Sequence, residues 1–220
     1  MANIVVFGTG DIAQLAHYYF SKDSDHTVAA FTVNREYAKN STFIDLPVVA
    51  FENVENQYPP DRYRMFIAVS YARVNKVRAE KYYQAREKGY ELASYVSSKA
   101  CVFDTVAIGD NCFILEDNTL QPFAKIGNNV TLWSGNHIGH HSTIGDHCFI
   151  SSHVVVSGGV VIEPYCFIGV NATLRDHITI ARETVIGAAC LMLKNTKEGE
   201  VYVGTAAEPR SITSDRLKRI

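Results

Sequence analysis

The sequence predicts two structural units, a small parallel α/β domain at residues 1–97 and a parallel β-helix with a C-terminal cap at residues 98–220. An aliphatic residue recurs at every sixth position from Val102 to Ile186, and the residue four positions after most of them is small or β-branched. A six-residue period fits neither an α-helix nor an alternating strand. It is typical of a triangular coil of three short strands, whose stacking buries the aliphatic columns.

Strand and helix patterns alternate over residues 1–97, which indicates a small Rossmann-like parallel sheet. A buried strand at residues 3–7 leads through two glycines into a helical pattern that ends near Phe20. The other expected elements are strands at about 27–33, 46–49, 65–70 and 91–96, and a helix at about 74–88 that Gly89 caps. After the repeats we expect a polar loop at 191–200, an extended segment at 201–207, and a short helix, capped by Thr213 or Ser214, that ends at Ile220.

The segment from Gly8 to Ala13 has the G-x-G-x-x-A spacing of a loop that cradles phosphate at a helix N-terminus. The same spacing suits a tight turn that packs a helix on a strand, and both interpretations stay open. A dinucleotide dehydrogenase is not expected, because the unit is short and Asn34 stands where an acidic residue would bind the ribose. Ligands of open α/β sheets bind at the carboxyl ends of the strands. The acceptor-binding candidates at these ends are Gly8, Gly10, Asp11, Asn34, Arg35 and Tyr71.

The composition excludes several classes of protein. The 220 residues carry a formal charge of −2 and no basic block, so nucleic acid is not an expected partner. The N-terminus lacks the features of a leader peptide, and no apolar stretch is long enough for a bilayer, so we expect a cytoplasmic protein. Four of the five cysteines occupy small inward positions of the repeat, which indicates buried thiols rather than redox or metal chemistry.

Six of the eight histidines lie in the repeat region. Five of these six occupy outward turn positions, where hydrogen bonding at an edge or at a subunit interface is the ordinary role. His140 is predicted to lie one coil from Gly158, because three six-residue repeats make one coil. An imidazole is a suitable general base near neutral pH. His140 is therefore the candidate base, and a structural role is the alternative.

The segment Ile138–Asp146, the glycine loop and the closing segment Tyr202–Arg210 together resemble the bacterial hexapeptide-repeat sugar acetyltransferases. These include the sialic-acid O-acetyltransferases and the N-acetyltransferases of nucleotide-linked 4-amino sugars. The resemblance implies a left-handed β-helix, acetyl-CoA as co-substrate, no metal, and a homotrimer with its sites between subunits. It also implies acetyl transfer to an amino or hydroxyl group of a sugar, nucleotide-linked in part of the family, in surface polysaccharide biosynthesis.

The resemblance assigns roles to particular residues. His140 falls on the family's general base and His141 on the acidic residue that orients this base. A backbone carbonyl or Asp146 is the alternative partner for the same imidazole. Gly158 falls on a glycine whose N–H faces the thioester. The residues expected to contact coenzyme A are Gly158, Val170, Gly187, Ala188 and Gly204.

The chain departs from the family pattern at three places. Leu132-Trp133-Ser134 replaces an Asn-Thr pair, Phe149 replaces a histidine near the acetyl group, and Asp11-Ile12 replaces Gly-His in the glycine loop. Two alternatives stay open, namely transfer of another acyl group and a trimeric sugar-nucleotide-binding or scaffold protein without acyl transfer. A zinc carbonic anhydrase on the same fold is not expected, because no two histidines have the spacing of its His-x4-His pair.

Overall fold

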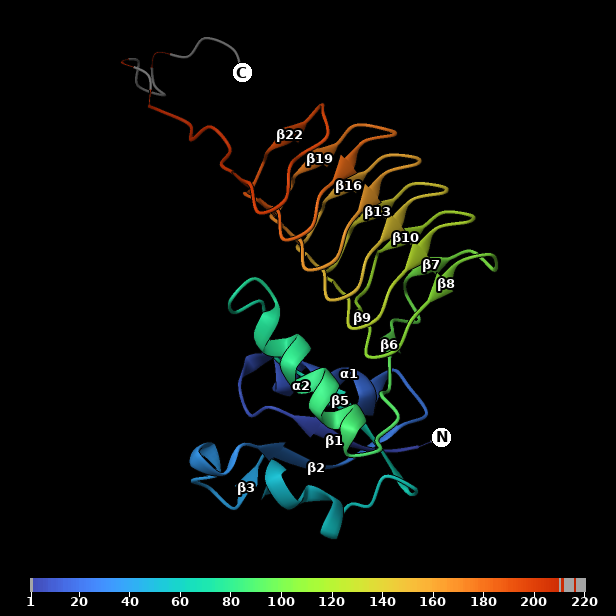
Figure 1. The fold of residues 1–220 in the computed structure, drawn as a ribbon, viewed down its shortest axis with the longest axis vertical. Helices are drawn as coiled ribbons and strands as arrows, with labels where there is room; N and C mark the ends of the chain where they lie inside the picture. The colour runs from blue at the N-terminus through green and yellow to red at the C-terminus, as the bar shows by residue number, and fades with distance from the viewer. Residues whose placement is uncertain (1, 210, 212–215, 217–220) are drawn as a thin grey trace.

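The structure is a computed structural model that describes residues 2–209, 211 and 216. An N-terminal α/β unit lies at one end, and a triangular β-prism rises from it (Figure 1). The prism is a left-handed parallel β-helix, so the predicted fold class is confirmed for both parts. Within the described ranges, no helix is long and apolar enough to cross a membrane.

The sheet of the α/β unit has the strand order β3-β4-β2-β1-β5. Its strands are β1 (Asn3–Phe7), β2 (Thr27–Val33), β3 (Thr42–Phe43), β4 (Leu46–Ala50) and β5 (Tyr63–Ile67). Neighbouring strands pair in parallel, except that β3 is antiparallel to β4. The segments that follow β1, β2 and β5 therefore meet at one edge of the sheet.

Four helices belong to this unit, of which α2 (Lys76–Glu87) follows the last strand of the sheet and the others connect its strands. The others are α1 (Asp11–Lys22) and the 3-10 helices η1 (Arg35–Tyr37) and η2 (Phe51–Asn56). The predicted cap of α2 is present, since Gly89 has a φ of 88°. The N–H of Gly89 donates to Arg86 O at 2.9 Å, and the N–H of Tyr90 donates to Ala85 O at 3.1 Å. These bonds satisfy the last carbonyls of the helix and require a left-handed residue, which glycine provides.

The prism consists of two-residue strands in three flat sheets of seven, six and five strands. The β12 sheet contains β6 (Tyr95–Val96), β9 (Phe113–Ile114), β12 (Thr131–Leu132), β15 (Phe149–Ile150), β18 (Phe167–Ile168), β21 (Val185–Ile186) and β23 (Val201–Tyr202). The β13 sheet contains β7 (Cys101–Val102), β10 (Thr119–Leu120), β13 (His137–Ile138), β16 (Val155–Val156), β19 (Thr173–Leu174) and β22 (Leu191–Met192). The β14 sheet contains β8 (Ala107–Ile108), β11 (Lys125–Ile126), β14 (Thr143–Ile144), β17 (Val161–Ile162) and β20 (Thr179–Ile180).

Each prism strand pairs in parallel with the strand one coil later, as Ile138 does with Val156. The inward aliphatic side chains fill the interior, and those of Ile138, Ile144 and Ile150 have no exposed surface. Turns connect the three sheets along three edges, which we name after a residue on each. The His140 edge joins the β13 sheet to the β14 sheet, the His147 edge joins the β14 sheet to the β12 sheet, and the Ala188 edge joins the β12 sheet to the β13 sheet.

A residue with positive φ recurs at every sixth position from Asn111 to Ala189, once in each turn. Four histidines occupy this position with φ between 55° and 63°, and they are His141, His147, His153 and His177. Histidine, like Asn and Asp, is enriched in the left-handed region among non-glycine residues. Turn geometry is therefore the first explanation for most of the histidines of the repeat region.

The α/β unit is attached to the prism along the His147 edge. Arg78 of α2 is only 1% exposed, and its guanidinium donates to the carbonyl oxygens of His147 and Cys148, both at 3.0 Å. The side-chain amide of Asn75 donates to the carbonyl of Cys166 at 3.1 Å. Burial lowers the pKa of Arg78 to about 10, which still leaves the guanidinium charged at neutral pH.

The structure corrects two expectations about the ends of the prism. The segment expected as one strand at 91–96 is divided, because Leu92 bridges to Met65 in the α/β unit whereas β6 pairs with β9. The stretch 191–200 is more than a polar loop, since β22 continues the repeat and buries Met192. The terminal helix expected to end at Ile220 falls, apart from Arg216, on residues outside those that the structure describes.

His147 lies beneath α2, where only 1% of it is exposed. Its Nε2 is hydrogen-bonded to the hydroxyl of Tyr83 at 2.9 Å, and its Nδ1 accepts from the amide of Asn129 at 2.8 Å. Burial lowers the pKa of His147 to about 4. This histidine therefore joins two parts of one chain and does not face a second subunit.

His147 makes the stability of the protein depend on pH. The unfolded chain protonates this imidazole at about pH 6.5, whereas the folded chain resists protonation until about pH 4. The unfolded state binds more protons between these values, so stability falls as the pH drops from about 6.5 to 4, by at most about 3 kcal/mol. We expect His147→Asn, which also tolerates the left-handed turn, to remove this contribution in urea unfolding at pH 7 and pH 5. His153→Asn is the exposed control, and an unchanged pH dependence in His147→Asn would contradict the prediction.

Candidate active site

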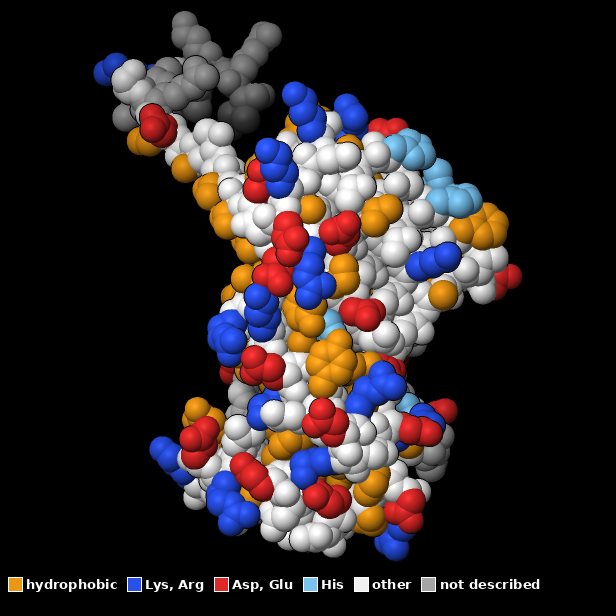
Figure 2. Space-filling model, in the orientation of Figure 1, with side chains coloured by type: hydrophobic (Ala, Val, Ile, Leu, Met, Phe, Trp, Pro, Cys, Tyr) orange, Lys and Arg blue, Asp and Glu red, His pale blue; other side chains and the backbone are white. Residues whose placement is uncertain are grey.

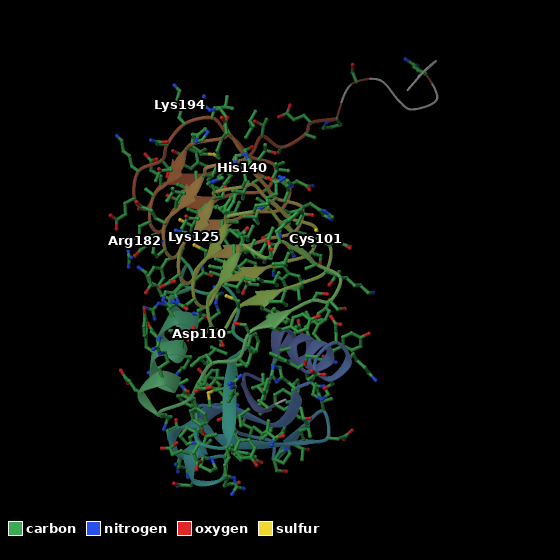
Figure 3. The ribbon with its side chains drawn as sticks, turned by 90° about the vertical axis from the view of Figure 1, so that its right-hand side faces the viewer. Cys101, Asp110, Lys125, His140, Arg182 and Lys194 are labelled. Carbon is green, nitrogen blue, oxygen red and sulfur yellow. The ribbon has the colours of Figure 1, made fainter. Side chains whose placement is uncertain are left out.

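The His140 edge holds two adjacent histidines, His140 and His141, whose rings contact each other. The ring of His140 extends to the next coil and lies over Gly158. A Cβ atom on Gly158 would lie 2.7 Å from both Nε2 and Cε1 of that ring, so only glycine leaves room for it. Figure 3 shows His140 among the upper coils, well away from the α/β unit. The structure thus brings His140 and Gly158 together, as their separation of one coil predicts.

The partner of His140 is His141. Their Nδ1 atoms lie 3.1 Å apart, and the two rings are nearly perpendicular, at 85°. The backbone N–H of His140 donates to the side-chain oxygen of Gln121 at 2.9 Å, which fixes the turn. When Nδ1 of His140 donates to Nδ1 of His141, Nε2 of His140 carries a free lone pair. No described residue is hydrogen-bonded to that Nε2, so it is available to a substrate.

The N–H of Gly158 is also open. In the coil below, the N–H of His140 is satisfied by the side chain 19 residues earlier, Gln121, and the same pattern recurs at Arg182. The residue 19 positions before Gly158 is Gly139, which has no side chain to offer. The N–H of Gly158 therefore has no acceptor among the described residues, and it lies beside the His140 ring. A donor of this kind can stabilise an oxyanion.

Asp146 does not reach His140. It lies on the His147 edge, where its Oδ1 accepts from the N–H of Asn128 at 2.7 Å. Six residues along the chain correspond to one side of the triangle, so Asp146 belongs to the next edge. Within one chain, the residue that contacts the His140 ring is His141, which the resemblance places there, and not the alternative Asp146.

The residues expected to contact coenzyme A lie on two different edges. Gly158 is on the His140 edge, whereas Val170 and Ala188 are on the Ala188 edge. Gly187 lies at the same corner, and Gly204 packs directly against the carbonyl of Ala188. One chain therefore does not bring these five residues together.

Packing explains one of the two glycines of the glycine loop, Gly8. Its φ is 125°, and a Cβ atom there would lie 2.7 Å from the carbonyl oxygen of Ala68, so the ends of β1 and β5 approach closely. Gly10 is the N-cap of α1, and a Cβ atom on it would meet nothing within 4 Å. Asp11 follows as the first residue of α1 and is exposed. Packing thus explains Gly8 but not Gly10.

The other acceptor candidates lie at the same edge of the α/β sheet. Asn34 accepts a hydrogen bond from Lys81 at 2.9 Å, and the backbone N–H of Arg35 donates to the carboxylate of Glu52. Tyr71 is half exposed, and its ring contacts the β12 sheet of the prism.

The aromatic rings beneath Tyr71 form a platform that was not predicted from the sequence. Phe149 and Phe167 stack with centroids 5.6 Å apart at 16°, and the ring of Tyr71 lies about 5 Å from both. Phe149 and Phe167 are one coil apart in the sequence, and this spacing could have predicted that their rings stack. Phe149 is buried in this contact and so belongs to the attachment of the α/β unit.

In the described part of the chain, no three His, Cys, Asp or Glu side chains are placed to hold a metal ion.

Residues 123–158, which include His140 and Gly158, match the family described as bacterial transferase hexapeptide, six repeats. The UDP-3-O-acylglucosamine N-acyltransferase of Herminiimonas arsenicoxydans is 30% identical over 124 residues, which are 54% of this chain and 34% of that protein. The mitochondrial gamma carbonic anhydrase 2 of Arabidopsis thaliana is 30% identical over 128 residues, which are 52% of this chain and 39% of that protein. The chain therefore spans little more than a third of the length of these curated relatives.

Two solved structures resemble nearly the whole chain. A mutant of perosamine N-acetyltransferase from Caulobacter crescentus, in complex with CoA and GDP-perosamine, has a TM-score of 0.84 at 20% identity, covering 93% of this chain and 94% of that one. The acetyltransferase domain of PglB from Neisseria gonorrhoeae has a TM-score of 0.80 at 18% identity, covering 96% of this chain and 100% of that one. At these identities the likeness establishes a common fold, and at that level it confirms the resemblance seen in the sequence.

Two glycine substitutions distinguish the His140 contact from the stacking of coils. We expect Gly158→Ala to displace the His140 ring and shift its NMR signals, with a loss of Tm of at most about 2 °C, because the end of a side chain can rotate away. Gly145→Ala is the matched control, since its Cβ would lie 2.7 Å from the backbone nitrogen of Pro164. We expect it to lower Tm by at least about 4 °C. Equal losses would mean that stacking alone requires both glycines.

Proposed function

We propose that the protein transfers the acetyl group of acetyl-coenzyme A to an amino or hydroxyl group of a sugar, with His140 as general base. The observation that carries the proposal is the imidazole of His140 lying over Gly158, where neither Nε2 of the ring nor the N–H of the glycine has a hydrogen-bond partner among the described residues. A nucleotide-linked sugar is the proposed acceptor, since the Caulobacter crescentus protein of the same fold was crystallised with GDP-perosamine and CoA. The proposed setting is surface polysaccharide biosynthesis in the cytoplasm.

The proposed chemistry uses three groups on the His140 edge. Nε2 of His140 accepts the proton of the acceptor amine or hydroxyl while the acceptor atom attacks the carbonyl carbon of the thioester. The N–H of Gly158 donates to the oxyanion that forms on the carbonyl oxygen. The C–S bond then breaks, and the imidazolium of His140 returns the proton to the departing thiolate. His141 accepts from Nδ1 of His140 and so keeps Nε2 unprotonated before the reaction.

The proposed site requires two copies of the chain. The His140 edge is the one edge of the prism that the β12 sheet does not touch, so it lies opposite that sheet. Tyr71 packs on the β12 sheet, and Val170 and Ala188 border it. A ring closed by a threefold axis can bring the His140 edge of one copy to the β12 sheet of the next. We therefore propose a homotrimer with three shared sites.

His140→Ala tests the proposed base. We expect kcat to fall by about 10²–10⁴-fold, because a general base contributes that much. The measurement is thiol release from acetyl-CoA, with a panel of nucleotide-linked amino sugars and free sialic-type sugars as acceptors. As the control for folding, CoA at 100 times its Kd should still stabilise the variant by about 2.7 kcal/mol.

Other outcomes of the same experiment favour the alternatives. Full turnover in His140→Ala would remove this histidine from the mechanism. A parent protein that CoA does not stabilise would favour a trimeric sugar-nucleotide-binding or scaffold protein. Turnover with formyl or longer acyl donors, but not with acetyl-CoA, would favour another acyl group.

Mixing two inactive variants tests the shared site. His140→Ala removes the base from the His140 edge. Ala188→Glu places a charged side chain at an exposed position of the Ala188 edge. When equal amounts of both chains assemble at random, about a quarter of the interfaces combine an intact His140 edge with an intact Ala188 edge. We therefore expect about a quarter of the parental activity in the mixture and almost none in either variant alone. No recovery after verified subunit exchange would mean that each site lies within one chain.

A further inference from the structure

We infer that Phe123 is a positioning residue that holds the ring of His141 and, through it, the base His140. Phe123 lies on the His140 edge one coil before His141, and the two ring centroids are 4.8 Å apart at a tilt of 40°. His141 in turn contacts His140, and the Nδ1 atoms of these two rings lie 3.1 Å apart. The inference deepens the proposed function and rests on it, because Phe123 acts only through His141.

The conformation of Phe123 is unfavourable for its residue type. Its φ is 66°, in the left-handed region, where a bulky side chain is a genuine outlier. The side chain gains little from burial in return, since Phe123 is 52% exposed. Figure 2 shows histidine side chains gathered on the upper part of the prism, next to exposed hydrophobic surface. The contact with His141 is therefore the most direct reason for an aromatic residue at this turn.

An imidazole partner needs such support more than a carboxylate does. A carboxylate has two equivalent oxygens and several lone pairs, so it can accept from Nδ1 of His140 in many orientations. A neutral imidazole accepts only through the in-plane lone pair of one nitrogen. The plane of the His141 ring must therefore be held, and the packed aromatic ring of Phe123 restricts its rotation.

Replacement of Phe123 by Asn separates positioning from stability, because Asn tolerates the left-handed turn. We expect Phe123→Asn to leave Tm unchanged or raise it by up to about 4 °C. We expect kcat to fall by about 10–100-fold, which is part of the contribution of the general base, with KM for acetyl-CoA within about twofold. Phe123→Tyr keeps the ring and should retain kcat. The measurements are thermal unfolding, thiol-release kinetics and the oligomeric state by light scattering.

Tyr165 provides a matched control on the His147 edge. Its φ is also 66°, and its ring lies 4.8 Å from that of His147 at 37°. It lies under the attachment of the α/β unit, where Arg182 packs over it. We therefore expect Tyr165→Asn to lower Tm and to change kcat of the folded protein little, which is the reverse of Phe123→Asn.

Several results would overturn the inference. Full kcat in Phe123→Asn would remove Phe123 from the mechanism. Loss of Tm and kcat together, as in an ordinary packing defect, would make its role structural, and dissociation of the oligomer would make it a subunit contact. If His140→Ala keeps full activity, the proposed function fails and this inference fails with it. If His140→Ala is inactive while Phe123→Asn is fully active, only the inference fails.

Discussion

The stacking of three-sided coils in register is the constraint on which the rest of the structure depends. Each prism strand pairs with the strand one coil away, so a residue's neighbours are those one coil before and after it. The aliphatic columns supply the apolar burial that favours this arrangement. One left-handed residue per turn lets the chain change direction every six residues. Glycines such as Gly145 lie where neighbouring backbones come too close for a side chain.

This constraint explains what the sequence could predict. The six-residue period identified the prism and its interior, and it paired His140 with Gly158, because contacts along an edge follow from sequence separation alone. The attachment of the α/β unit could not be found in this way. Arg78 donates only to main-chain carbonyls, which every residue type has, so its partners on the prism leave no signal in the sequence. Strand β22 was not predicted, because Met192 stands at the position of the repeated aliphatic residue and the stretch around it is polar.

The same rule explains where the expected site residues lie. Asp146 is close to His140 in sequence, but six residues move it to another edge, where it caps Asn128. The residues expected to bind coenzyme A were assigned by resemblance, which does not say which copy of the chain supplies each one. Within one chain, Gly158 and Ala188 lie on different edges. The resemblance places His141 at the position of an acidic residue, and its Nδ1 lies 3.1 Å from Nδ1 of His140.

The proposed site, shared by two copies, makes the orientation of the α/β unit part of the proposed chemistry. In the proposed trimer the acceptor is held by the α/β unit of one copy while the base comes from the prism of another, so any rocking of that unit changes the reacting distance. A misplacement of about 1 Å can cost about 10²-fold in rate. Burying the guanidinium of Arg78 against carbonyl oxygens, with no carboxylate among its described partners, is a costly way to gain stability. It is an effective way to fix one rigid body on another, because four directed hydrogen bonds tie α2 both to the segment that carries Tyr71 and to the edge of the prism. In the proposed trimer, the requirement for a fixed orientation therefore accounts for Arg78 better than stability does.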